Sequence, residues 1–381
     1  MKSKNTKLGI YNIITEIGIA SLYCFIILTL YTFVFDYNYA LLKFRFLVLI
    51  LGGICGVLGH LRKINIKVLA FIYIFSLVYI FTIIIGRSGY YEFDLFWYSF
   101  SYMCITLNLL DHNLDLNATK ILYYVSMVIF LFRIIVMRIP IREFLKDGSS
   151  YNYISVLALL PLGLYLIALA QNKKNVPIGA AVIYFIITII SYGRGGIVTG
   201  GMLITLSIFQ SVNNIKRKDF KYLLIACLGL FLILILNTNI YTWFVSLAFK
   251  KFVLLGNDAG AGRIEYWTTY IRLCGKNFYT FLVGYDPYVI RSDGNLHNSF
   301  LQCYAYFGLP FFIICLVCLI KTIRLSTQKN ETTLFILVIV LCLRAFTDKL
   351  FFQGYCEIYL YYLIFYALNT SNWKSSQIVV Q

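Results

Sequence analysis

The residue types that could do chemistry in this chain gather in one polar stretch, 237–299, within a sequence that is otherwise almost continuously apolar. Arg263 and Glu265 lie near the middle of this stretch, and His297 lies near its end. Arginine binds phosphate and carboxylate oxygens through a planar fork of N–H donors, and histidine accepts a proton near neutral pH. The stretch therefore predicts a site that binds an anionic group and moves a proton.

His297 is the residue that we expect to act as a general base. It follows a turn-rich run, Ser292-Asp293-Gly294-Asn295, and shares the polar stretch with several charged side chains. The alternative is a structural histidine that only forms hydrogen bonds at a membrane surface. Glu265 or Asp293 could orient the imidazole, and the arginines of the same stretch are Arg263, Arg272 and Arg291.

Arg194 is a second candidate for anion binding. It stands in Ser191-Tyr192-Gly193-Arg194-Gly195-Gly196, which interrupts the apolar sequence between 176–192 and 195–211. A guanidinium at membrane depth costs about 3 kcal/mol or more, so such residues tend to face a cavity or a partner. Two alternatives stay open: a site residue, or a tight turn whose arginine reaches the outer lipid headgroups.

The segment 263–272 has the spacing of an amphipathic helix. Ile264, Trp267 and Ile271 fall on one face of it, whereas Arg263 and Glu265 do not share a face. This pattern favours a helix that lies in the outer membrane interface.

Arg344 and Asp348 lie four residues apart near the outer end of a late apolar run. That spacing favours an ion pair within one helix. The alternative for Arg344 is a further anion-binding arginine.

The sequence predicts neither a metal site nor a cofactor. The signatures HExxH, GxSxG and paired CxxC do not occur in it. The ten cysteines lie mostly inside apolar runs, where cysteine behaves as a small buried hydrophobe. Any catalysis is therefore expected to be metal-independent.

The composition identifies the class of protein. Hydrophobic residues make up 60% of the 381 residues, charged residues 13%, and the mean hydropathy is +0.79. These values predict an all-α polytopic membrane protein that forms a single domain, 1–381. The net charge of +17 does not indicate a nucleic-acid partner, because the basic residues stand in short clusters between apolar runs. Such clusters suit anionic lipid headgroups of the bilayer.

About 20 apolar residues are needed to cross the hydrocarbon core, and on that rule we expect about twelve spans. They run near 8–34, 44–61, 66–86, 95–110, 121–139, 153–170, 176–192, 195–211, 221–238, 299–320, 332–349 and 355–370. One long loop, 239–298, connects the ninth and tenth spans.

The distribution of lysine and arginine orients these spans. Basic clusters in the loops 60–67, 171–175, 213–221 and 321–331 place those loops and both termini in the cytoplasm, and the long loop on the external face. The less basic loop 111–120 falls on the cytoplasmic side as well. The connection 138–147 then lies outside and is more basic than the rule favours, although Glu143 and Asp147 partly offset its charge.

The chain resembles the Wzy-type polysaccharide polymerases and the related O-antigen ligases. The resemblance rests on the many spans with one late external loop, on Arg263-x-x-x-Trp267, and on His297-Asn298-Ser299-Phe300-Leu301 followed by Gly308. The turn around Arg194 is similar to the Ser-x-x-Arg-Gly element of that family, and Leu282-Val283-Gly284-Tyr285 is similar to its glycine-containing segment.

The resemblance implies a GT-C-like helical glycosyltransferase of the bacterial inner membrane. Its donor and acceptor would be undecaprenyl-pyrophosphate-linked oligosaccharides, and it would work beside a chain-length regulator and a flippase. In that reaction His297 would be the base, assisted by Glu265, and Arg263 and Arg194 would stabilise the leaving pyrophosphate. The implied substrate-binding residues are Arg291, Arg344, Arg272, Trp267, Tyr266 and Asn298; for the two aromatic residues, interfacial anchoring is the alternative.

Two other functions remain open from the sequence. A ligase of the same superfamily would pass the glycan to a different acceptor. A flippase or transporter of lipid-linked oligosaccharide would place charged residues inside its spans. Because most charges here lie in loops, the sequence favours an enzyme.

Overall fold

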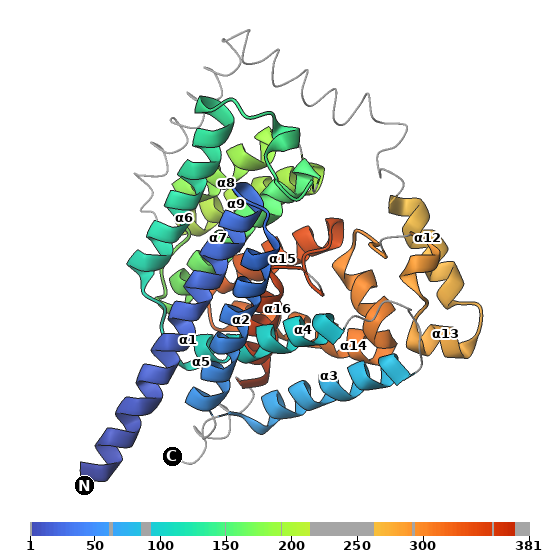
Figure 1. The fold of residues 1–381 in the computed structure, drawn as a ribbon, viewed down its shortest axis with the longest axis horizontal. Helices are drawn as coiled ribbons and strands as arrows, with labels where there is room; N and C mark the ends of the chain where they lie inside the picture. The colour runs from blue at the N-terminus through green and yellow to red at the C-terminus, as the bar shows by residue number, and fades with distance from the viewer. Residues whose placement is uncertain are drawn as a thin grey trace.

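The computed structural model describes residues 2–60, 64–84, 93–148, 150–191, 193–213, 263–291, 294–352 and 354–369. Within these ranges the chain forms helices joined by turns, and no strand occurs (Figure 1). The predicted all-helical class is confirmed to that extent. The predicted span 221–238, the first part of the predicted external loop and Asp293 lie outside the described residues.

The helices follow the predicted apolar runs. Before the long polar stretch they are α1 (Lys2–Val34), α2 (Tyr39–His60), α3 (Ile66–Ile84), α4 (Phe93–Thr106), α5 (Asn108–Asp111), α6 (Leu116–Leu131), η1 (Phe132–Val136), η2 (Ile141–Glu143), η3 (Tyr151–Tyr153), α7 (Ile154–Gln171), α8 (Ile178–Ile190) and α9 (Arg194–Asn213). Within and after it they are α12 (Arg263–Cys274), α13 (Phe278–Val283), η6 (Pro287–Val289), α14 (Ser299–Gln328), α15 (Thr332–Thr347) and α16 (Glu357–Asn369).

Six helices in the described part of the chain are long and apolar enough to cross a membrane. They are Gly9–Val34, Tyr39–His60, Leu116–Val136, Ile154–Gln171, Arg194–Val212 and Ser299–Gln328. Others are apolar but shorter: the 13 residues of α8 rise about 20 Å, less than the roughly 30 Å of hydrocarbon. The chain is therefore a membrane protein with several candidate spans. The lengths of the described helices do not establish the twelve spans that the sequence predicts.

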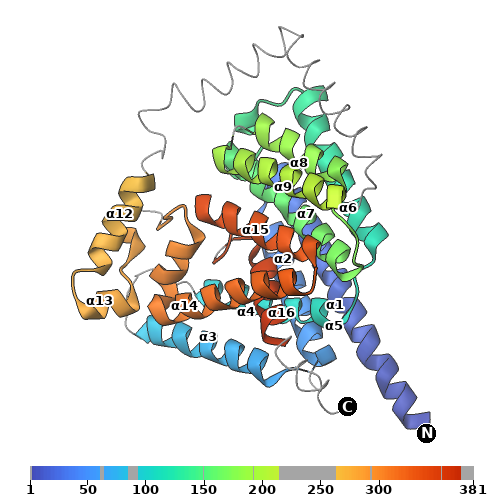
Figure 2. The ribbon, with the colours of Figure 1, turned by 180° about the vertical axis from the view of Figure 1, so that it is seen from behind.

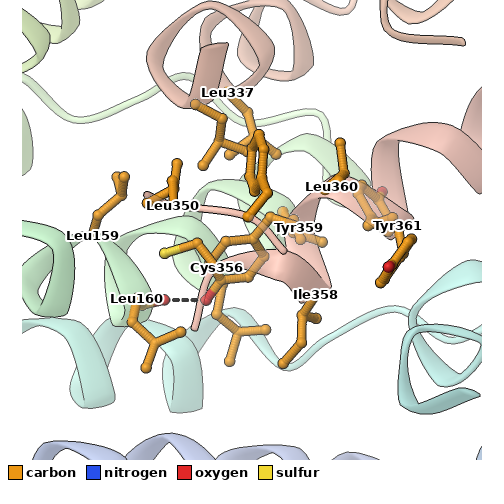
Figure 3. Close-up of a cluster of buried hydrophobic side chains, with 14 of the residues drawn as sticks. Leu159, Leu160, Leu337, Leu350, Cys356, Ile358, Tyr359, Leu360 and Tyr361 are labelled. Atoms are coloured by element: carbon orange, nitrogen blue, oxygen red, sulfur yellow. Dashed lines mark hydrogen bonds between the residues drawn. The ribbon is translucent and has the colours of Figure 1, made fainter. Parts of the chain in front are cut away.

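α7 is the central helix of the bundle. It is buried on all sides from Ile154 to Leu169, as expected for a helix surrounded by protein, and α6, α8 and α15 pack against it. Tyr359 of α16 reaches across to it and donates a hydrogen bond to the carbonyl of Leu160 (Figure 3). A Cβ at Gly163 would lie 2.4 Å from the Tyr359 ring, so glycine is required for this close approach.

α14 is broken after its first part. Gly308 has φ 76° and ψ 172° inside the helix, and Pro310 follows it. A Cβ at Gly308 would lie 2.9 Å from the carbonyl oxygen of Leu282, the residue before the end of α13. The break turns residues 299–307 toward α13 and separates them from the longer apolar part of the helix.

Loops predicted to be cytoplasmic meet at one end of the bundle. Gln171 Oε1 accepts from the backbone N–H of Leu114 at 2.9 Å, and Thr333 Oγ1 donates to the carbonyl of Lys174 at 2.7 Å. Gln210 Nε2 donates to Thr333 Oγ1 at 2.8 Å. The connections α5–α6, α7–α8 and α14–α15 therefore lie together at this end.

α12 and α13 lie at a different end, well away from the amino-terminal end of α1 (Figures 1 and 2). The start of α14 and the end of α15 face them there (Figure 2). The predicted helix 263–272 is confirmed, with two further residues, as α12. This end of the bundle carries the charged residues that the sequence singled out.

Candidate functional site

His297 stands on a turn that the surrounding residues hold in place. Its backbone has φ 51°, and its N–H donates to Asn295 Oδ1 at 2.9 Å. Left-handed backbone at a residue other than glycine is costly and tends to occur at functional sites. Asn298 follows as the N-cap of α14 and accepts from the N–H groups of Phe300 and Leu301. Asn298 is buried, and its side chain caps the first turn of α14.

Both ring nitrogens of His297 contact charged side chains. Nδ1 lies 3.4 Å from Asp348 Oδ1, and Nε2 lies 2.8 Å from Arg291 Nη1. Arginine can only donate hydrogen bonds, so Nε2 must be the acceptor and carry no proton. The neutral ring then carries its proton on Nδ1 and donates it to Asp348. This arrangement fixes the tautomer that a base acting through Nε2 requires.

Asp348 lies just beyond the end of α15, where Arg344, Arg263 and the imidazole of His297 converge on it. Arg344 Nη2 lies 3.1 Å from Asp348 Oδ2, which confirms the predicted pair four residues apart. Burial disfavours the charged carboxylate, but Arg344, the hydrogen bond from His297 and Arg263 outweigh it and lower the pKa of Asp348. Asp348 is therefore ionised and able to orient His297 and stabilise its protonated form.

Arg344 is 1% exposed and is held by the protein itself. Beyond Asp348, it donates to Ser155 Oγ at 3.2 Å and to Thr347 Oγ1 at 3.2 Å. Its guanidinium therefore connects Asp348 to Ser155 and fixes the position of the carboxylate.

Ser299 ties the first turn of α14 to the segment that carries Asp348. Its hydroxyl donates to the carbonyl of Asp348 at 2.9 Å and accepts from the N–H of Leu350 at 2.7 Å. The two segments that supply the histidine and the carboxylate are thus fixed to each other by backbone contacts as well as by the side chains.

Arg263 opens α12 and reaches the end of α15, where Nη1 donates to the carbonyl of Thr347. Burial is the main cause that lowers the pKa of Arg263; Asp348 opposes it, and the guanidinium groups of Arg344, Arg194 and Arg291 add to the lowering. Arginine nevertheless stays charged in proteins. Arg344, Arg194 and Arg291 are therefore near enough to Arg263 to affect its charge, and Arg344 and Arg263 both act on Asp348.

Arg194 is the first residue of α9, and α8 ends four residues before it at Ile190. A Cβ on the next residue, Gly195, would lie 2.3 Å from Thr347 Oγ1 and 2.9 Å from Arg344 Nη1. Glycine is therefore required for α9 to begin this close to α15. Arg194 therefore begins α9 at the point where this helix approaches Thr347 and Arg344, and its charge acts on Arg263.

The aromatic residues of α12 support the site. Trp267 Nε1 donates to the carbonyl of Leu296 at 2.7 Å, and its ring contacts Phe346 edge-on at 5.4 Å. The Arg291 guanidinium lies over the ring of Tyr266 at 5.2 Å. Trp267 therefore holds the residue before His297, and Tyr266 holds the arginine that contacts it.

Two predicted residues of α12 lie apart from this group. Glu265 and Arg272 are both exposed. Arg272 is nine residues after Arg263, which places it on the opposite face and about 13 Å farther along the helix. The carboxylate beside His297 is Asp348, whose partnership with the histidine the sequence did not reveal.

We name the group of His297, Asp348, Arg194, Arg263, Arg291 and Arg344 the arginine cluster. It combines an ionised carboxylate, a histidine with an unprotonated Nε2 and four positive charges, which can bind a phosphate-bearing substrate and accept a proton. In the described part of the chain, no three His, Cys, Asp or Glu side chains are grouped to hold a metal ion.

No protein-family model matches the chain, and a search of the curated proteins finds no match.

Proposed function

We propose that the protein polymerises undecaprenyl-pyrophosphate-linked oligosaccharide repeats into surface polysaccharide at the external face of a bacterial cell membrane. The observation that carries the proposal is His297 held between Asp348 and Arg291 within the arginine cluster. A base with a fixed tautomer beside several guanidinium groups suits glycosyl transfer from a lipid pyrophosphate to a sugar hydroxyl.

The leaving group of this reaction is a pyrophosphate, which needs stabilisation of its developing charge more than it needs a proton. Arginine forks match phosphate oxygens in pairs. Arg263, Arg194 and Arg291 are the arginines proposed to bind it, while Arg344 stays with Asp348. Fixed donors aimed at developing charge commonly supply the largest part of a rate enhancement.

The acceptor hydroxyl gives its proton to Nε2 of His297. Its oxygen forms a bond to the anomeric carbon, and the bond from that carbon to the phosphate oxygen breaks, leaving its electron pair on the pyrophosphate. The imidazolium that forms is stabilised by Asp348. Such a base typically contributes about 10²–10⁴-fold to a rate.

Arg291 gives this mechanism an order of events. In the structure it donates to the nitrogen that must accept the proton. A donor pyrophosphate, carrying more negative charge than a neutral imidazole, would draw Arg291 away and expose Nε2. Binding of the donor would thereby prepare the base, so that the acceptor is deprotonated only when a donor is present.

The finer topology belongs to the same proposal. We place twelve spans in a GT-C-like arrangement, with both termini in the cytoplasm and the arginine cluster outside. Supporting this, the loops expected inside share one end of the bundle, and the cluster is built from α9, α12, α14 and α15 at another.

The test is glycan chain length in cells deleted for the gene and complemented with variants at matched membrane levels. His297→Gln and Arg263→Ala should leave single lipid-linked repeats on the outer face. Arg272→Ala is the matched control on the same helix and should retain polymer. Normal polymer with His297→Gln would overturn the mechanism. Repeats trapped on the inner face of deleted cells would identify a flippase, and free polymer that never reaches its acceptor would identify a ligase.

A further inference from the structure

An apolar groove runs between α1 and α6, two helices that contribute no residue to the arginine cluster. Its volume is about 550 Å³. Tyr23 and Leu30 line it from α1, Phe35 lines it from the turn directly after α1, and Ala118, Val125 and Phe130 line it from α6. α7 packs against both helices from behind. The groove is therefore an open depression on the side of the bundle, with apolar walls.

The groove has the length of one membrane leaflet. Phe35, directly after the end of α1, is twelve residues from Tyr23, and Phe130 is twelve residues from Ala118 on α6; each separation corresponds to about 18 Å of helix. Half of a hydrocarbon core is about 15 Å. One extended acyl chain fits this depth, whereas a long polyprenyl chain exceeds it several times.

One end of the groove lies on the same side of the bundle as the arginine cluster. The N–H of Lys146 donates to the carbonyl of Phe33 at 2.9 Å, so the connection after η1 crosses the end of α1. A few residues later, the carbonyl of Asn152 accepts from Arg344 Nη2 at 3.4 Å. By the topology proposed above, this is the outer leaflet end.

Basic side chains outnumber the acidic Glu143 and Asp147 on the connection that crosses that end. The Arg133 guanidinium lies 4.7 Å from the ring centre of Phe35, which lines the groove, and 5.5 Å from that of Phe144. Arg133 is 5% exposed, and its Nε has no hydrogen-bond partner among the described residues. Arg138, Arg142 and Lys146 are exposed on the same connection. These residues belong to the connection 138–147, which the predicted topology places outside although it is more basic than external loops usually are.

We infer that the groove binds an anionic phospholipid, with one acyl chain along α1 and α6 and its phosphate among Arg133, Arg138, Arg142 and Lys146. The apolar walls match the chain, and the basic end matches the headgroup. Each basic residue near an anionic headgroup strengthens such binding by roughly fivefold. The chain site and the charge site are continuous at Phe35, so one molecule occupies both. This inference does not depend on the reaction proposed above.

The experiment is native mass spectrometry of the purified full chain in detergent, titrated with phosphatidylglycerol or phosphatidylcholine of equal chain length. We expect saturable binding of phosphatidylglycerol at one strong site and at least about tenfold weaker binding of phosphatidylcholine. The triple variant Arg138→Gln, Arg142→Gln and Lys146→Gln should weaken phosphatidylglycerol by roughly tenfold or more. Its matched control is Lys173→Gln, Lys174→Gln and Arg324→Gln; each triple holds one residue with φ 52°.

A second pair of variants tests the chain site. Val125→Trp fills the groove, whereas Val128→Trp adds the same bulk to an exposed position of α6 that does not line it. Only the first should reduce phosphatidylglycerol binding. Unchanged binding in Val125→Trp, or in the basic triple variant, would overturn the inference. So would equal binding of both phospholipids, equal competition by inorganic phosphate, or selective binding of a polyprenyl phosphate.

Discussion

Arg291 Nη1 lies 2.8 Å from Nε2 of His297, so the nitrogen that should take a proton is occupied by a group that can only donate. The same arginine covers the ring of Tyr266, which holds it in this position. The base is therefore masked in the structure as it stands. Chemistry at Nε2 therefore requires that Arg291 leave His297 and bind an anionic group instead.

This masking predicts the reactivity of His297 toward diethyl pyrocarbonate, which attacks an unprotonated ring nitrogen. In Arg291→Gln, we expect His297 to be modified several-fold faster than in the wild type. Inorganic pyrophosphate should accelerate the modification in the wild type by drawing Arg291 away. Peptide mass spectrometry resolves His297 from His60, whose Nδ1 lies 3.0 Å from the carbonyl of Gly56 and serves as an internal reference. Equal rates in both proteins would show that the arginine does not mask the base.

Asp348→Asn is expected to abolish most activity and to lower stability. It keeps the shape of the side chain but leaves the buried Arg344 without its counter-charge, which typically costs about 3–5 kcal/mol. It also removes the carboxylate that stabilises protonated His297. Thermal unfolding in detergent and glycosyl transfer measured together check both effects. Asp36→Asn, an exposed carboxylate between α1 and α2, is the control and should behave like the wild type.

The same carboxylate predicts a pH dependence. The pKa of Asp348 is lower in the folded protein than its ordinary value of about 3.9, so the ionised form stabilises the fold at every pH above that value. The contribution is lost as pH falls through the folded-state pKa. Between about pH 5 and pH 3, the melting temperature of Asp348→Asn should therefore change less with pH than that of the wild type. Parallel curves for the two proteins would contradict this.

Gly195→Ala tests the contact between α9 and α15. The added Cβ would meet Thr347 and Arg344 at less than 3.0 Å, which forces a shift and costs about 1–3 kcal/mol. Because Arg344 holds Asp348, activity should fall as well. Gly201→Ala is the matched control on the same helix, since its nearest atom would be 3.9 Å away. Helix propensity alone would make both alanines slightly stabilising, so opposite signs of the change in melting temperature would confirm the contact.

Local spacing was sufficient to predict part of this architecture. The apolar runs became helices, the pattern of 263–272 became α12, and Arg344 paired with Asp348. Each of these depends on residues a few positions apart, where the geometry of one helix determines the contact. The break in α14 was missed although Gly308 and Pro310 mark it, because the run around them is uniformly apolar.

The contacts that make the site were not predictable from spacing. His297 and Asp348 are 51 residues apart, and Arg263 meets the carbonyl of Thr347 across 84 residues. Such pairs depend on how whole helices pack, which composition does not reveal. Glu265 was a reasonable partner for His297 by proximity in sequence, yet it points to the exposed side of α12. The signal that could have identified Asp348 is its charge at the end of an apolar run.

Trp267→Phe separates positioning of the base from binding of the donor. The substitution removes the indole N–H that holds the carbonyl of Leu296 but leaves an aromatic ring to contact Phe346. Leaving a buried carbonyl unpaired costs about 1–3 kcal/mol, and the turn that carries His297 should loosen. We expect kcat to fall roughly tenfold with KM for the donor nearly unchanged, because the arginines stay in place. Arg291→Gln should instead raise KM, since it removes a phosphate contact. Trp97→Phe on α4 is the control, and a rise in KM for Trp267→Phe without a fall in kcat would assign the tryptophan to substrate binding.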